Sequence, residues 1–145
     1  TRLVGRLGPR FARRGAPGGS VVLGAPSGDH HALPTAILRD LLRARGFHVV
    51  DLGADVPCES WADALGHADG GGPLVAVGMS ISTPGLDGAL AEAVAAVRAA
   101  TTAPIVLGGG AVPDARADDL DVDHITTSAT DALEAFEACA EQRER

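Results

Sequence analysis

The sequence contains no lysine, and all twelve of its basic residues are arginine. This absence excludes a Walker A phosphate loop and a Schiff-base lysine, because both depend on a lysine side chain. Tyrosine is also absent, and aromatic residues make up only 3% of the 145 residues. Proteins that bind single-stranded nucleic acid stack its bases on aromatic rings, so this shortage argues against such a partner.

Long apolar runs and paired cysteine motifs are missing as well. No apolar run approaches the ~18 residues of a membrane span, although 46% of the residues are hydrophobic. Cys58 and Cys139 form no C-x-x-C motif, which favours buried reduced thiols. The net charge of −7 argues against a nucleic-acid surface on the main body. We therefore expect a soluble, cytoplasmic protein without a membrane partner, and we do not expect this domain itself to bind nucleic acid.

The first 18 residues differ from the rest of the chain in charge. Five of the twelve arginines lie within the first fourteen residues, and the first acidic residue is Asp29. We interpret residues 1–18 as an Arg-rich N-terminal arm or linker, and favour a solvated arm over a phosphate-binding one. Because the sequence starts at Thr1 rather than at Met, one interpretation is that the arm ends a longer segment. Residues 19–145 are the right length for one domain.

From residue 20 onward, short β-branched runs alternate with stretches rich in alanine and leucine. This alternation is typical of βα units around a parallel sheet. We predict strands near residues 20–24, 47–52, 74–79, 104–107 and 124–127, and helices near 33–45, 57–69, 84–99, 113–120 and from 130 onward. Five such units predict a single flavodoxin-like domain, an α/β fold with a doubly wound, five-stranded parallel sheet.

The first predicted helix is strongly amphipathic. Its arginines are expected largely outside the apolar face, and Gly46 follows its end. The apolar residues that we place on one face are Leu33, Ile37, Leu38, Leu41 and Leu42.

Ligands of such sheets bind beyond the carboxyl ends of the strands, so the loops there are the candidate site. Asp29 precedes His31 by two positions in the first of these loops. A metal-bound imidazole usually donates its other ring N–H to a carboxylate, which this spacing allows. The alternative is a helix-capping Asp beside a solvated His. One histidine is too few for a protein-only zinc site, so a metal would have to arrive in an organic ring.

The other loops also allow two interpretations each. Ser80 and Ser82 follow an apolar run typical of a central strand, and either cap the next helix or bond a buried heterocyclic nitrogen. The glycines from Gly108 to Gly110 form either a flexible turn or bare backbone against which a flat or chain-like ligand can lie. No G-x-G-x-x-G motif follows the first strand, which argues against a dinucleotide site.

Taken in chain order, these loops resemble the cobalamin-binding domain family found in methionine synthase, corrinoid methyl carriers, carbon-skeleton mutases and light-sensing regulators. The family's Asp-x-His-x-x-Gly loop is similar to residues 29–34, where Pro34 replaces the glycine. Its Ser-x-Thr stretch resembles residues 80–83, and its Gly-Gly turn resembles Gly108 and Gly109. Residues 46–57 are similar to its second strand and following turn. The resemblance covers about residues 19–140.

The resemblance implies that His31 is the lower axial ligand of cobalt, in place of the cofactor's dimethylbenzimidazole, and that Asp29 binds its far ring nitrogen. Pro34 is compatible with the first turn of a helix, but it limits how closely the nucleotide tail approaches the backbone. The cofactor is cobalamin, in its methyl, adenosyl or hydroxo form. The implied cofactor-binding residues are Asp29, His31, Ser80, Ser82, Thr83, Gly108, Gly109, Thr127 and Ser128, with His31 as the metal ligand and no catalytic residue.

Two functions compete under this resemblance. One is a corrinoid carrier module that serves a partner methyltransferase or a carbon-skeleton isomerase. The alternative is a cobalamin-dependent light or ligand sensor, such as a photoreceptor or transcriptional regulator, or a degenerate domain without a cofactor. We expect a partner protein or an upstream domain to cover the upper face of the corrinoid. We identify no substrate pocket or general base, so a cofactor-binding module is favoured over a self-sufficient enzyme.

Overall fold

The computed structural model describes residues 19–112 and 119–144. The predicted arm and most of the helical piece predicted at 113–120 therefore lie outside the described residues. Strands and helices alternate along the described chain, as predicted. The elements are β1 (Gly19–Gly24), α2 (Leu33–Ala44), β2 (Phe47–Asp51), α3 (Cys58–Gly66), the short 3-10 helix η1 (Ala68–Gly71), β3 (Leu74–Ser80), α4 (Asp87–Ala100), β4 (Ile105–Gly108), β5 (His124–Ile125) and α5 (Ala129–Glu144).

The five strands form one sheet in the order β2-β1-β3-β4-β5, and every neighbouring pair is parallel. This is the flavodoxin-like strand order, so the predicted fold class is confirmed. The chain winds outward in one direction from β1 to β2 and in the other from β3 to β5. The crevice where the winding reverses therefore lies at the carboxyl ends of β1 and β3.

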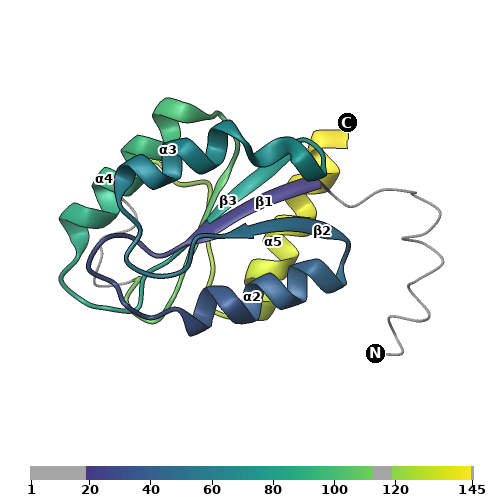
Figure 1. Cartoon of the computed structure of the whole chain (residues 1–145). Coiled ribbons are helices and arrows are strands. Elements are labelled where there is room, and N and C mark those ends of the chain that lie inside the picture. The colour runs from purple at the N-terminus through teal and green to yellow at the C-terminus, as the bar shows by residue number, and fades with distance from the viewer. Residues whose placement is uncertain (1–18, 113–118, 145) are drawn as a thin grey trace.

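Two helices cover each face of the sheet: α3 and α4 lie on one side, and α2 and α5 on the other (Figure 1). Alternate strand residues point to opposite faces, so Val22 and Val77 pack in the α3–α4 layer. Val21 and Ala76 pack in the α2–α5 layer. This arrangement confirms the doubly wound prediction.

Helix α2 departs from the predicted packing. Leu42 is fully buried and Leu38 is partly buried, but Leu33, Ile37 and Leu41 are 68%, 46% and 37% exposed. The predicted apolar face is therefore buried at Leu42, partly buried at Leu38 and exposed in large part at the other three residues. Residues spaced by four lie on the same side of a helix, and no other described element fully covers the side that carries these three. Thr35 takes a buried position instead.

Several predicted boundaries also differ from the structure, and the helix predicted near 57–69 ends at Gly66. The third predicted helix starts at Asp87 rather than at residue 84. The fifth strand contains only His124 and Ile125. Thr126 still donates its N–H to the carbonyl of Leu107, but regular pairing ends there as the chain turns toward α5.

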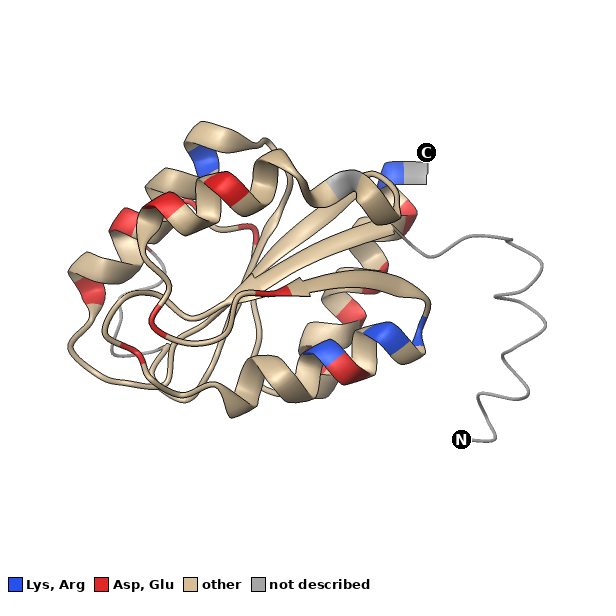
Figure 2. Cartoon of the chain, viewed as in Figure 1, with Lys and Arg blue, Asp and Glu red and all other residues tan. Residues whose placement is uncertain are grey.

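Charged residues occur mainly on the helices and in the loops (Figure 2). Arg45 binds Glu137 at 2.6 Å and so connects the end of α2 to α5. Arg98 of α4 binds Asp121 and Asp123 at 3.2 and 2.6 Å. No helix among the described residues combines the length and apolar character that crossing a membrane requires.

Candidate functional site

Asp29 connects the two loops that meet at the crevice. Its side chain is fully buried. Oδ1 accepts hydrogen bonds from the backbone N–H of His31 at 3.2 Å and from Oγ1 of Thr83 at 3.2 Å. Oδ2 accepts the backbone N–H of Ser82 at 2.6 Å. One carboxylate therefore joins the loop after β1 to the loop after β3.

These hydrogen bonds also determine the charge of Asp29. Burial by itself raises the pKa of the carboxyl group, because a charge is poorly solvated inside the protein. The bonds donated by Ser82, His31 and Thr83 favour the anion and outweigh that effect, so the pKa lies below its ordinary value. Asp29 is consequently an anion at neutral pH.

The imidazole of His31 is oriented by this anion. Its Nδ1 lies 2.9 Å from Oδ1 of Asp29, and its side chain is 58% exposed. Since a carboxylate only accepts hydrogen bonds, Nδ1 carries the proton and Nε2 keeps a free lone pair. His30 has no bond to Asp29 and lies instead with Nδ1 4.0 Å from Oδ2 of Asp55. The geometry thus presents one imidazole nitrogen of His31 as an available metal ligand.

The helix-capping alternative for Asp29 does not fit this geometry. Helix α2 begins after Ala32, which forms no side-chain cap. The capping alternative for the two serines does not fit either, because α4 follows Leu86 and has no side-chain cap. Ser82 instead donates its backbone N–H to the carboxylate of Asp29.

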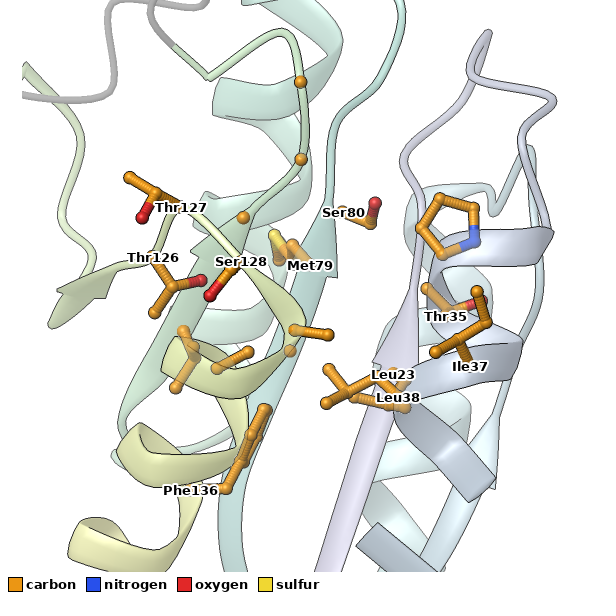
Figure 3. A pocket seen from close by; sticks show the side chains of 18 residues that line it. Leu23, Thr35, Ile37, Leu38, Met79, Ser80, Thr126, Thr127, Ser128 and Phe136 are labelled. Carbon is orange, nitrogen blue, oxygen red and sulfur yellow. The ribbon is translucent and has the colours of Figure 1, made fainter. Parts of the chain in front are cut away.

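A cavity of about 250 Å³ opens beside this cluster, between the sheet and helices α2 and α5. Figure 3 shows Thr35, Ile37 and Leu38 on one wall and Phe136 on the other. Gly78 lies on the floor, where a Cβ atom would come within 2.6 Å of Leu23 and 2.7 Å of Phe136. The absence of a side chain at this position therefore leaves room for Leu23 of β1 and Phe136 of α5 to pack over β3 beneath the cavity.

Ser80 is the polar exception in this largely apolar cavity. Its hydroxyl is buried and has no hydrogen-bond partner, and among the described residues no other lining side chain has such an atom. Unpartnered buried polar atoms are rare because each costs about 1–3 kcal/mol. A ligand atom that hydrogen-bonds Ser80 would remove that cost.

The glycine turn after β4 lines the same cavity. Gly109 has a φ of +116°, and a Cβ atom there would collide with the backbone of Ile81. The N–H of Ile81 donates to the carbonyl of Gly108 at 2.9 Å, which fastens the turn to the loop after β3. Bare backbone at Gly109 is therefore required by packing, and Gly110, with no atom near its Cβ position, borders open space.

Thr127 and Ser128 line the far side of the cavity and immediately precede helix α5. The hydroxyl of Thr127 donates to Asp131 at 2.6 Å, and the N–H of Asp131 donates to Oγ of Ser128 at 3.0 Å. These bonds satisfy groups at the helix start and hold both residues against the cavity.

The predicted site residues therefore form two adjoining groups. One group is the carboxylate of Asp29 with its partners His31, Ser82 and Thr83. The other group lines the cavity and consists of Ser80, Gly108, Gly109, Thr127 and Ser128. Sequence reasoning did not select Thr35, Ile37, Leu38, Gly78, Thr126 and Phe136, which line it too. Only Gly78 carried a local signal, since a glycine inside a strand often marks close approach of a neighbour.

No group of three or more His, Cys, Asp or Glu side chains in the described ranges could hold a metal ion. A metal at His31 would thus need its other ligands from a molecule that brings them.

Known proteins that are similar to this chain bind such a molecule, vitamin B12 or a related corrinoid. A family model described as the B12 binding domain matches residues 19–137. The methanol–corrinoid protein of Methanosarcina barkeri is 38% identical over 65 residues, which cover 45% of this chain and 24% of that protein. The chain thus spans about a quarter of this curated relative.

Solved structures show the same similarity. A cobalamin-binding protein from Desulfitobacterium hafniense is 26% identical with a TM-score of 0.72, over 83% of this chain and 58% of its own. The methanol:cobalamin methyltransferase complex MtaBC from Methanosarcina barkeri is also 26% identical, with a TM-score of 0.73, over 86% of this chain and 47% of that chain. The monomethylamine corrinoid protein of Methanosarcina barkeri, at 19% identity and a TM-score of 0.70, shares the fold.

Proposed function

The chain belongs to the B12-binding domain family, and we propose that it binds a corrinoid through His31 and carries it for a separate methyltransferase. The observation that carries this proposal is the pairing of exposed His31 with the buried anion Asp29, beside a cavity that contains one unpartnered hydroxyl. These residues fit a corrinoid, because its ring supplies the cobalt ligands that the protein lacks.

His31 is proposed as the lower axial ligand, with Nε2 as the ligating atom. Asp29 holds the proton on Nδ1, which keeps the ring in the tautomer that can ligate. A ligating imidazole paired with a carboxylate is also a stronger electron donor to the metal. Ser82 and Thr83 act through Asp29, since their N–H and hydroxyl groups bind its carboxylate.

The cavity is proposed to take the nucleotide tail that His31 displaces from cobalt. The hydroxyl of Ser80 would bond the heterocyclic base, and Gly108 and Gly109 would lie along the tail together with Thr127 and Ser128. Pro34 also lines the cavity, so it reduces the space that a glycine would leave at the entrance.

The carrier role rests on the relatives. The curated relative is a methanol–corrinoid protein, and one matching structure is a complex with methanol:cobalamin methyltransferase. Bound cobalamin supplies the cobalt–carbon bond whose methyl group is transferred, so methylcobalamin is the proposed working form. This chain spans about half the length of those structures, and we propose that a partner protein or a further part of the natural protein covers the upper face.

A titration with cobalamins tests the ligand role of His31. The chain, labelled with ¹⁵N, is titrated with hydroxo-, methyl- and adenosylcobalamin, and the cobalt(II) form is examined by electron paramagnetic resonance. Nitrogen ligation by the protein replaces the three-line ¹⁴N splitting of the free cofactor by a two-line ¹⁵N splitting. We expect this change in the wild type and in His30→Ala, and its loss in His31→Ala.

Two results would contradict the proposal. Retention of no corrinoid by the wild type would refute cofactor binding, and an unchanged ¹⁵N splitting in His31→Ala would refute the ligand assignment. A change of molecular size on illumination of the bound protein would instead favour a light sensor over a methyl carrier.

A further inference from the structure

Asp55 occupies an unusual backbone conformation beside the candidate site. Its φ is +54°, and among the described residues it is the only non-glycine residue with a positive φ. Left-handed backbone is unfavourable for residues with a Cβ atom, although Asp and Asn adopt it more readily than most. Such a conformation persists only where surrounding contacts stabilise it.

The contacts of Asp55 go to the loop that carries His31. Its backbone N–H donates to the carbonyl of Asp29 at 2.8 Å. Its Oδ1 accepts the backbone N–H of Gly28, also at 2.8 Å. The left-handed turn lets the backbone and the side chain of one residue bind two consecutive residues of the neighbouring loop.

Asp55 ends a ladder of bonds between the loops that follow β1 and β2. Ala25 donates its N–H to Gly53 at 2.9 Å and accepts the N–H of Val56 at 2.9 Å. The hydroxyl of Ser27 donates to the carbonyl of Val56 at 3.2 Å. The bonds of Asp55 to Gly28 and Asp29 are the last of this ladder before the loop after β1 reaches His31.

The carboxylate of Asp55 also faces the second histidine of the loop. Its Oδ2 lies 4.0 Å from Nδ1 of His30, whereas His31 lies 2.9 Å from Asp29. The two adjacent histidines are thus directed toward two different carboxylates.

We propose that Asp55 is a positioning residue for the Asp29–His31 pair; the inference rests on the proposed function of His31. The carboxylate of Asp29 meets donors on both loops at once, and a displacement of its backbone would break at least one of those bonds. By binding residues 28 and 29, Asp55 holds that backbone in register and thereby holds the proton on Nδ1 of His31.

Three substitutions separate the parts of this role. Asp55→Asn keeps an acceptor and a tolerance for left-handed backbone, Asp55→Gly keeps the conformation but loses the side-chain acceptor, and Asp55→Ala loses both. Asp63→Ala is the matched control, because Asp63 lies on α3 with its Oδ1 likewise 4.0 Å from a histidine, His67, and makes no side-chain bond to the site.

The first measurement uses the whole chain without corrinoid. Ring ¹⁵N and ¹H NMR signals report which nitrogen of His31 carries the proton. We expect a single Nδ1–H tautomer in the wild type, Asp55→Asn and Asp63→Ala, and a mixture of tautomers in Asp55→Ala and Asp55→Gly. The amide of Gly28 should exchange about tenfold faster in Asp55→Ala, consistent with the loss of its hydrogen bond to Oδ1 of Asp55. An unchanged His31 tautomer in folded Asp55→Ala and Asp55→Gly would overturn the proposal.

The second measurement is the affinity for hydroxocobalamin. Asp55→Ala should bind about five- to tenfold more weakly, whereas Asp55→Asn and Asp63→Ala should stay within about twofold of the wild type. Equal affinities of all variants would contradict the positioning role. If the wild type binds no corrinoid, the proposed function fails, but the tautomer measurement still decides the role of Asp55. If Asp55→Ala does not fold, Asp55→Gly and Asp55→Asn provide the same comparison.

Discussion

The two faces of the sheet are covered by similar pairs of helices but are filled differently. On the α3–α4 face, Trp61 and Leu90 are fully buried in the core of the layer. On the α2–α5 face, α2 leaves Leu33 and Ile37 exposed, and a cavity of about 250 Å³ remains between the helices. The candidate cofactor site therefore lies in the layer whose core contains a cavity.

The difference should appear first in stability. Trp61→Ala removes a fully buried aromatic side chain from the α3–α4 layer and should lower the free energy of unfolding by about 3–5 kcal/mol. Leu33→Ala, on the open face, should change it by less than about 0.5 kcal/mol, because Leu33 is 68% exposed. Urea unfolding measures both. Similar losses in the two variants would mean that the faces are packed alike.

The glycine turn provides a comparison within the open face. Gly109→Ala should destabilise the fold by about 2–3 kcal/mol, because its φ of +116° and the adjacent backbone of Ile81 leave no room for a methyl group. Gly110→Ala is the control, since no atom lies near its Cβ position. Thermal unfolding of both variants distinguishes them, and equal midpoints would show that the turn is not fastened to Ile81.

Two buried serines at opposite ends of the sheet test the purpose of the cavity. Ser20→Ala loses a bond to the carbonyl of Gly72 at 2.9 Å and should destabilise the protein by about 1 kcal/mol. Ser80→Ala loses an unpartnered hydroxyl, so the free protein should be as stable as the wild type or slightly more stable.

Corrinoid binding should reverse the order of these two variants. Ser80→Ala should bind hydroxocobalamin about five- to tenfold more weakly, because the base loses a hydrogen bond, whereas Ser20→Ala should bind normally. Urea unfolding and absorbance titration give the two readouts. Full affinity in Ser80→Ala would remove Ser80 from the proposed tail site.

The smallest expected effect is on the dependence of stability on pH. Burial raises the pKa of Asp29, but its hydrogen bonds lower the pKa by more than burial raises it. The pKa in the folded state therefore lies below that in the unfolded state. The unfolded state then binds more protons in acid, and this stability is present above the ordinary pKa of an aspartate and is lost as pH falls through the lower folded pKa.

Asp29→Asn should therefore lose less stability between neutral pH and about pH 3 than the wild type, which urea unfolding at each pH measures. Asp123→Asn is the comparison on another carboxyl group. Burial by itself raises the pKa of Asp123. The hydrogen bonds from Arg98 and Ile105 lower it by more, so the pKa lies below its ordinary value. An Asp29→Asn profile parallel to that of the wild type would contradict the contribution of Asp29.

The pattern of the sequence was sufficient for the fold. Runs such as residues 74–79 are apolar throughout, which is typical of a strand buried on both faces, and the alternation with helical stretches favours parallel pairing. The sequence also placed Asp29 and His31 in one loop at the carboxyl edge. Both signals are local, since they depend on spacing along a few residues.

What the sequence determined alone was therefore the order of strands and helices and the identity of the loops at the edge where ligands bind. Only the tertiary structure brought Ser82 and Thr83 to Asp29, set Asp55 against Gly28, and left Leu33, Ile37 and Leu41 partly exposed. These outcomes depend on contacts between segments far apart in the chain, and on how one helix rotates against the sheet, which spacing within a single segment does not encode.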